Sequence, residues 1–447
     1  MKKAIIFLGI LAVFALASLN SGIKAYADER YSDLQNFSKV LNLIQQYYVE
    51  EVDTKKLIYG AIKGMLKELD PHTNFMPPEM FKDFETETSG EFGGLGIEIS
   101  LQNNILTVIS PIEDTPAWEA GIKPGDRIVA VNGTSTKGLS LVESSQLMRG
   151  KKGSKVILRV VREGEEDPRD IAVVRGNVKI KSVKYTDLDE TYAYVKITSF
   201  IENTSKDLEK TLAAHVSKHK KIGGLVIDMR RNPGGLLDQA IKVSDLFLKS
   251  GVIVSTIGRD PKNKEISMAS KKGPYTDFPV IILVNEYSAS ASEIVAGALQ
   301  DNKRALIMGQ RTFGKGSVQS VVKLGDGSGL KLTVARYYTP SGVSIQSEGI
   351  NPDVEIEDVD LEAFTKAIVK NKATREKDIQ GHLKSDREKK GEKKKSQDDG
   401  AMAWWKDMGN KKDENLSARE KLFKSDYQAY QAYSYLKAWK TLQVLSK

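Results

Sequence analysis

The sequence of 447 residues contains no cysteine. This absence excludes disulfides, a thiol nucleophile and a lipid attached to a leader cysteine. A chain of this length without disulfides has to be held by packed hydrophobic cores, and its 40% hydrophobic residues are sufficient to build them. The length leaves room for about three domains. Charged residues make up 28% of the chain, a share that excludes a bundle of membrane helices.

The sequence also lacks a stripe of interleaved aromatic and basic residues. The formal net charge of +8 comes partly from the N-terminal leader, and much of the remaining basic character lies in a lysine-rich run near the C-terminus. We therefore predict no nucleic-acid partner.

A long hydrophobic run is missing as well. The apolar stretch Ala4 to Leu19 is shorter than the about 20 residues that span a bilayer. It follows Lys2-Lys3 and precedes the small-x-small cleavage site Ala25-Tyr26-Ala27. These features predict a signal peptide over residues 1–27 and export to the periplasm or cell envelope. An uncleaved N-terminal anchor is the alternative.

Residues 28–89 are predicted to form an N-terminal helical region. Apolar residues recur there at three-and-four spacing in two stretches, and Asp53-Thr54 is suited to cap the second helix. The recurring residues are Leu34, Phe37, Val40, Leu41, Ile44 and Tyr48, then Leu57, Ile58, Ala61, Ile62, Met65 and Leu66. Two amphipathic helices supply half of a core, so they must pack on the rest of the chain or on a second copy. We favour the second copy and predict a homo-oligomer, a dimer or higher.

Residues 90–175 begin with a glycine turn that runs into an alternating strand. Successive N–H groups of Gly94-Leu95-Gly96 can hold a terminal carboxylate, and pairing along Ile97 to Ile99 can add a peptide as a further strand. The segment, including the run Pro116 to Asp126, resembles a PDZ domain throughout. The resemblance predicts binding of proteins or peptides with free, apolar C-termini at Gly94, Leu95, Gly96 and Ile97.

Residues 176–360 alternate short apolar strands with helices, which indicates an α/β sheet. In its centre, the strand Val280 to Val284 is followed by Ser-Ala-Ser-Ala-Ser at 288–292 and then by a helical pattern. A serine on a strand-to-helix turn has an exposed hydroxyl beside the free N–H groups of a helix start. These are the parts of a nucleophile and an oxyanion hole.

The glycine turn Thr312 to Gly316 carries Lys315 one unit further along the chain. Its amine, if buried among apolar neighbours, could lose its proton and act as a general base beside that serine. By local pattern alone, a packing turn and a surface lysine are an equally good interpretation.

Two other motifs overlap this region. Gly309 to Lys315 fits a phosphate loop, but Gly316 stands where the metal-binding Ser or Thr is needed, and a strand pattern follows instead of a helix. Ser320 to Lys323 fits S-x-x-K without its companion motifs, and no G-x-S-x-G occurs. The chain is therefore not predicted to bind nucleotides or to be an α/β-hydrolase.

Ser-Ala-Ser-Ala-Ser-Glu-Ile and Thr-Phe-Gly-Lys-Gly-Ser-Val-Gln resemble the motifs of the carboxyl-terminal processing proteases. The resemblance runs from about Asp70 to Asp353 and implies a ββα crotonase- or Clp-like protease core with an inserted PDZ domain. It implies that Ser290 is the nucleophile, Lys315 the base and Gln319 the residue that orients Lys315. Positions four apart share one face of a strand, so Lys315 and Gln319 would both point toward the site if the strand begins at the turn.

The run Asp-Met-Arg-Arg-Asn-Pro-Gly-Gly at 228–235 is similar to the family's Asp-Leu-Arg-x-Asn-x-Gly-Gly. By that resemblance, the N–H of Ala291 and the N–H of Gly234 or Gly235 form the oxyanion hole. Val343 replaces an arginine of the family, so no contact of that arginine is carried over.

Arg149, at the end of the module's predicted helix, has two interpretations. It either complements the helix dipole or transmits peptide binding to the catalytic site. The second is suggested by the family's known module-gated activity, and a separate adaptor protein is a possible further partner.

His215 and His219 have the i, i+4 spacing of metal ligands. No glutamate follows as in H-E-x-x-H, and neighbouring lysines add positive charge. We interpret both as solvated surface residues and predict no metal and no cofactor.

The C-terminal part is predicted to comprise a charged linker over 361–411 and a helix over 412–447. The helix carries an aromatic stripe that we expect to pack in a core or a dimer. The whole pattern favours an exported serine endopeptidase, and the alternative is a non-catalytic PDZ scaffold that binds protein C-termini.

Overall fold

The computed structural model describes residues 31–111, 115–139, 141–165, 167–179, 181–270, 273–359, 383 and 416–445. The predicted signal peptide and almost all of the predicted charged linker lie outside these residues. The chain divides into two compact units, one formed by residues up to Pro78 with Val321–Leu332, the other by Glu79–Ser320 with residues from Thr333 onward.

The first unit contains a helix over residues 31–47 and helix α2 (Thr54–Lys67). Asp53 caps α2 as predicted, because its carboxylate accepts a hydrogen bond of 2.8 Å from the Lys55 N–H. Strand β1 (Asn74–Met76) pairs antiparallel with the first residues of β18 (Gly329–Tyr338).

An apolar stripe on the helix over residues 31–47 is exposed. Its large side chains are Tyr31, Leu34, Phe37, Val40, Leu43 and Tyr47. A second copy of the chain as the partner of this stripe stays a prediction.

The second unit contains an inserted module, which we define as residues 91–179. Its sheet has the strand order β3-β4-β5-β7-β8, with β6 paired to β5. The elements are β3 (Ile97–Gln102), β4 (Ile105–Pro111), α4 (Pro116–Glu119), β5 (Arg127–Val131), β6 (Thr134–Ser135), α5 (Leu141–Met148), β7 (Lys155–Val161) and β8 (Arg169–Val174). Two flanking strands, β2 (Glu91–Gly94) and β9 (Gly176–Lys179), pair antiparallel and form the neck of the module.

The core sheet of the second unit has the order β10-β11-β12-β15-β16-β19. The strands are β10 (Val183–Asp187), β11 (Tyr192–Ile197), β12 (Gly224–Asp228), β15 (Val280–Val284), β16 (Ala305–Gly309) and β19 (Val354–Glu355). All neighbours are parallel except β10 and β11. Continuous apolar runs such as Val280–Val284 are buried on both faces, as central parallel strands require.

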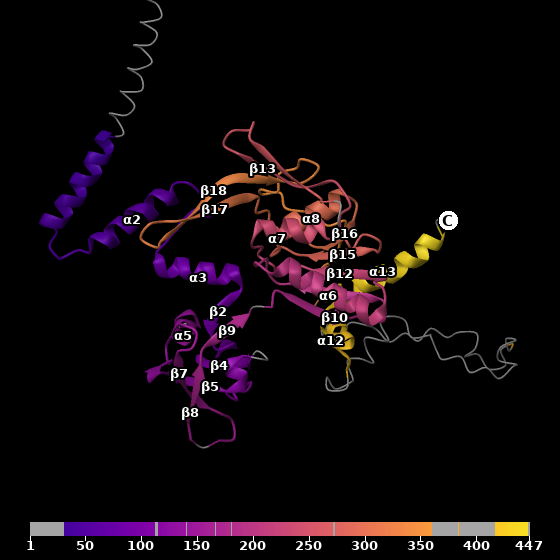
Figure 1. Ribbon diagram of the computed structural model, residues 1–447, viewed down its shortest axis with the longest axis horizontal. Helices are drawn as coiled ribbons and strands as arrows, with labels where there is room; N and C mark the ends of the chain where they lie inside the picture. The colour runs from indigo at the N-terminus through magenta and orange to yellow at the C-terminus, as the bar shows by residue number, and fades with distance from the viewer. Residues whose placement is uncertain are drawn as a thin grey trace, which may run out of the picture. The chain divides into compact units, whose positions relative to one another are not determined.

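Helices cover both faces of this sheet (Figure 1). On one face lie α6 (Thr204–His219), α7 (Leu237–Asp245) and α8 (Ala291–Asp301). On the other lie α12 (Ala418–Ser425) and α13 (Tyr427–Leu445). Alternate residues of each strand point to opposite faces of the sheet. Ile282 therefore packs with α6, α7 and α8, and Ile281 packs with α12 and α13.

The C-terminal helix differs from the prediction, because it is broken at Asp426 into α12 and α13. The aromatic stripe packs on the core sheet through Tyr433 and Leu436, while Trp439 is exposed. Core packing is therefore the correct alternative for the buried part of the stripe.

A second sheet has the order β1-β18-β13-β14, with β17 on β18. Its remaining strands are β13 (Val252–Gly258), β14 (Lys264–Met268) and β17 (Ser317–Lys323). Nowhere in the described ranges is there a helix with the length and apolarity needed to cross a membrane.

Candidate active site

The three serines of the turn between β15 and α8 differ sharply in their surroundings. Ser288 and Ser292 are fully buried, and their hydroxyls donate to the main-chain carbonyls of Met229 and Asn232 at 2.9 and 3.0 Å. Ser290 between them is half-buried. The flanking serines therefore fasten the turn, and the middle one stays partly exposed.

The backbone of Ser290 is held in an unusual conformation, with φ 55° and ψ −111°. Non-glycine residues with positive φ are uncommon and cluster at functional turns, where the surrounding structure has to enforce them. Ser290 is the residue directly before α8, so the N–H of Ala291 belongs to the first turn of the helix, where N–H groups have no helical acceptor.

Glu293 is the residue that enforces this turn. It is fully buried, and its Oε2 accepts from the N–H groups of Ser290 at 2.7 Å and Lys315 at 2.9 Å. Its Oε1 accepts from the Thr312 hydroxyl and the Gly314 N–H, both at 2.6 Å. Burial raises the pKa of Glu293, while these four donors act in the opposite direction. One carboxylate thus joins the serine turn to the lysine turn.

The structure places Lys315 half-buried in the glycine turn before β17. The strand begins at Ser317, so Lys315 lies outside it and does not share a strand face with Gln319. Gln319 lies on β17, with its amide nitrogen 3.5 Å from the Thr333 hydroxyl of β18, which is too long for a strong hydrogen bond.

The glycine turn after β12 lies directly against the serine turn. A Cβ on Gly234 would come within 2.8 Å of the Ser290 Cβ and 2.9 Å of the Ala291 nitrogen, and one on Gly235 within 2.2 Å of the Phe200 oxygen. Both glycines have positive φ. The Gly234 N–H donates to the Asn232 side chain at 2.9 Å and is therefore already engaged.

A buried ion pair anchors the beginning of this glycine turn. Asp228 is fully buried at the end of β12 and accepts bonds from the Arg230 guanidinium and the Tyr194 hydroxyl. Arg230 also binds Asp426 at the break between α12 and α13. Burial alone would raise the pKa of Asp228, but Arg230 and the nearby Lys196 outweigh it, and the pKa is lowered.

We expect this ion pair to make the unfolding free energy of the protein depend on pH. A carboxylate with a lowered pKa in the folded state contributes stability that is complete above its unfolded pKa of about 4 and is lost as the pH falls toward the folded value. Asp228→Asn, which leaves Arg230 partly unpaired, should lower the unfolding free energy at pH 7 by about 3–5 kcal/mol. Urea unfolding at pH 7, 5 and 3 should show that the difference in unfolding free energy between the wild type and Asp228→Asn becomes smaller below about pH 4. A gap that is constant with pH would contradict the assignment.

The predicted peptide-binding turn lies at an open edge of the inserted module. Strand β3 is the first of its sheet and pairs with β4 only on one side, so a peptide can be added along it. Leu95 is buried, and its carbonyl accepts from the Ala117 N–H at 2.8 Å. Gly96, with φ +78°, packs against Thr115, whose hydroxyl donates to the Gly96 carbonyl at 3.2 Å. The shape of the turn is therefore fixed by contacts within the module.

Arg149 follows α5 and reaches helix α3 (Pro78–Ser89). Its guanidinium lies 3.4 Å from the Asp83 carboxylate, and both side chains are substantially exposed. An exposed ion pair of this length contributes about 0–1 kcal/mol to stability. It connects the module's helix to the segment that precedes the neck.

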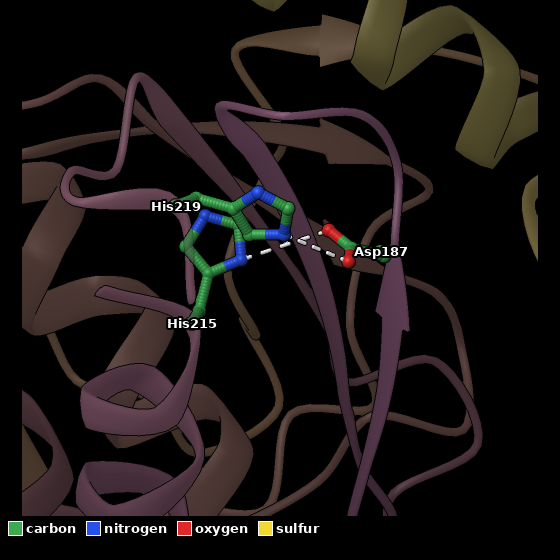
Figure 2. Close-up of side chains that lie close together, drawn as sticks. All are labelled: Asp187, His215 and His219. Carbon is green, nitrogen blue, oxygen red and sulfur yellow. Dashed lines mark hydrogen bonds and ion pairs between the residues drawn. The ribbon is translucent and has the colours of Figure 1, made fainter. Parts of the chain in front are cut away.

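The interpretation of His215 and His219 as solvated surface residues is wrong. The His215 side chain is 0% exposed and that of His219 is 13% exposed. Both face Asp187 at the end of β10 (Figure 2). No local pattern predicts this burial, because Asp187 lies 28 residues before His215 in the chain and is brought to α6 only by the sheet.

Sequence reasoning also missed the roles of Glu293 and of the Asp228–Arg230 pair. For Glu293 a signal was present, since Ser-x-x-Glu before an apolar run is the pattern of a capping box. For Arg230 the acceptor Asp426 lies so far along the chain that no local pattern could reveal it.

Three protein-family models match the chain. Peptidase family S41 matches residues 191–356, the PDZ domain matches residues 107–162, and the N-terminal domain of the activating protease CtpB matches residues 15–80.

Curated relatives match over most of their length. A carboxy-terminal-processing protease of Bartonella bacilliformis is 43% identical over 392 residues, which are 87% of this chain and 89% of the relative. The carboxy-terminal processing protease CtpA of Bacillus subtilis is 38% identical over 73% of this chain and 69% of its own. Among solved structures, the photosystem II D1 C-terminal processing protease is 33% identical, with a TM-score of 0.44, over 72% of this chain and 92% of its own.

Proposed function

Because this chain belongs to the carboxy-terminal processing proteases of peptidase family S41 and contains a PDZ domain, we propose that it is an exported serine endopeptidase with a Ser290–Lys315 dyad. The observation that carries this proposal is the Glu293 carboxylate, which holds the N–H groups of both residues on one oxygen. It brings the two turns together around the single half-exposed serine of the motif.

In the reaction that we propose, an uncharged Lys315 amine takes the proton of the Ser290 hydroxyl as its oxygen attacks the peptide carbonyl carbon. The carbon–nitrogen bond then breaks, and Lys315 returns the proton to the departing amine. Water attacks the acyl-enzyme, gives a proton to Lys315, and the released Ser290 oxygen recovers it. Gln319 is proposed to orient Lys315 by its resemblance to the family motif.

The oxyanion is proposed to be held by the N–H groups of Ala291 and Gly235. Ala291 offers the first N–H of α8, whose orientation and positive dipole end favour a negative oxygen. Gly235 is favoured over Gly234 because the Gly234 N–H is committed to the Asn232 side chain. Gly234 lies close to the Ala291 nitrogen, so the N–H of the next residue, Gly235, is also near the proposed position of the oxyanion.

The PDZ domain is proposed to bind the free, apolar C-terminus of a protein substrate. The turn Gly94-Leu95-Gly96 would hold the carboxylate and the edge strand from Ile97 would pair with the peptide. The preceding, unfolded part of the substrate would then reach Ser290. A second copy of the chain would cover the exposed stripe of the helix over residues 31–47, and an adaptor protein would be a further partner.

Cleavage of a fluorogenic peptide with an apolar C-terminus tests the proposal. We expect turnover by the wild-type protein and weaker turnover when the peptide's terminal carboxylate is amidated, because the PDZ turn then loses its anion. Binding without any turnover, with and without cell extract as a source of adaptor, would support a non-catalytic scaffold instead.

Arg149 is proposed to transmit peptide binding from the PDZ domain to the catalytic residues through Asp83. Arg149→Ala should lower kcat several-fold, while the affinity of the PDZ domain for the peptide stays within about twofold, because Arg149 lies outside the binding turn. The exposed neighbour Lys151, changed to alanine, is the matched control. Unchanged turnover in Arg149→Ala would refute a gating role.

A further inference from the structure

Helix α6 and strand β10 bring three metal-ligating side chains together outside the proposed catalytic site (Figure 2). His215 and His219 are four residues apart and therefore lie on one face of α6. His219 Nε2 is 2.9 Å from Asp187 Oδ2, and His215 Nδ1 is 3.8 Å from Asp187 Oδ1. The rings of the two histidines lie 4.7 Å apart between centroids.

The spacing of these donors is close to what a small ion needs. One donor atom from each residue lies within 4.8 Å of the others. Tetrahedral zinc holds nitrogen and oxygen donors at about 2.0–2.2 Å, which places the donors about 3.4 Å from one another. Small side-chain rotations are therefore enough to gather all three around one ion.

The cluster also has an acceptor that the protein does not satisfy. Asp187 Oδ1 is buried and receives no hydrogen bond from any residue for which the structure has a placement. Buried polar atoms without a partner are rare and call for an explanation such as a bound ion.

Two neighbouring groups would have to yield to an ion. The Tyr185 hydroxyl lies 2.7 Å from His215 Nδ1, and Lys218 Nζ lies 2.6 Å from Asp187 Oδ2. The Lys218 side chain is 66% exposed, so it can turn into solvent when a cation replaces it. The Tyr185 hydroxyl can turn by rotation of its O–H toward the same carboxylate.

We propose that Asp187, His215 and His219 form a binding site for a first-row divalent transition-metal ion, for which zinc is the natural probe. Imidazole and carboxylate are donors suited to this class of ion. Since β10 is the edge strand of the core sheet, the ion would fasten this edge to α6. The site shares no residue with the dyad or the PDZ turn, so it is independent of the proposed peptidase mechanism.

Zinc titration of the full chain, produced without a histidine tag and stripped with EDTA, tests the site. We expect one zinc ion per chain by isothermal calorimetry and a higher melting temperature with zinc. His215→Ala/His219→Ala should weaken binding at least tenfold and abolish the shift in melting temperature. The chain has four histidines, so His72→Ala/His382→Ala is the matched control and should bind as the wild type does.

Two further measurements keep the test decisive if the double variant folds poorly. His219→Gln leaves the buried His215 in place and should also weaken binding at least tenfold. Cobalt(II) in place of zinc should give the visible absorption of a tetrahedral site in wild type and not in His219→Gln. Equal zinc binding by wild type, His219→Gln and the control double variant, or no binding by wild type, would overturn the proposal.

Discussion

Ser290→Ala should lower kcat for peptide cleavage on the order of 10⁶-fold, to the background rate, because it removes the attacking oxygen itself. Lys315→Ala should cause a loss of similar size, since a nucleophile and its base act as one unit and their effects are not additive. Both variants should still bind the apolar tail peptide at the PDZ domain. The measurement is cleavage of the fluorogenic peptide together with fluorescence anisotropy of a labelled tail.

The neighbouring serines provide matched controls for this experiment. Ser288→Ala and Ser292→Ala each remove a buried hydroxyl that binds a main-chain carbonyl, so each should cost about 1 kcal/mol of stability and keep most of the activity. Were Ser292→Ala to abolish cleavage while Ser290→Ala retained it, the assignment of the nucleophile would be wrong.

Glu293→Ala should lower kcat by about 10²-fold or more, although the side chain is not proposed to touch the substrate. Removing the carboxylate frees the N–H groups of Ser290 and Lys315, and a misplacement of catalytic groups by about 1 Å can cost that much. Four donors, of which the Thr312 hydroxyl and the Gly314 N–H make fully buried hydrogen bonds, also lose their acceptor, so the unfolding free energy should fall by several kcal/mol. Peptide kinetics and urea unfolding measure the two effects.

A positional role for Glu293 differs from a general loss of folding in one respect. At a temperature where the variant is fully folded by circular dichroism, kcat should stay low and KM should change little, because tail binding is elsewhere. Asp238→Asn, which breaks an exposed ion pair with Lys242 on α7, is the control and should have neither effect. Full kcat in folded Glu293→Ala would show that the turn holds its shape without the carboxylate.

Local patterns were sufficient for the parts of the fold whose causes are local. The all-apolar run Val280–Val284 predicts a buried strand, and Asp53 predicts the start of α2, because each depends on neighbouring residues alone. Whether Lys315 lies on the same strand as Gln319 could not be predicted from local patterns, because the strand begins two residues after Lys315 and no residue type marks that boundary.

The two predictions that the structure contradicts, an unbroken C-terminal helix and a solvated His215, failed for the same physical reason. The break of the C-terminal helix at Asp426 serves an ion pair with Arg230, and the burial of His215 depends on a strand that precedes its helix. Both are decided by residues far apart in sequence. A window of ten or twenty residues contains the side chain but not the partner that gives it its environment.

The neck formed by β2 and β9 has a consequence for how such proteins diversify. Because the chain leaves and re-enters the core on two hydrogen-bonded strands, with Glu91 opposite Lys179, the ends of the insertion stay adjacent whatever lies beyond them. Another recognition module, or a short hairpin, could replace the present one without altering the core sheet and the turns that carry the proposed catalytic residues. Substrate choice and bond cleavage are thus separable, and a lineage can exchange one while inheriting the other.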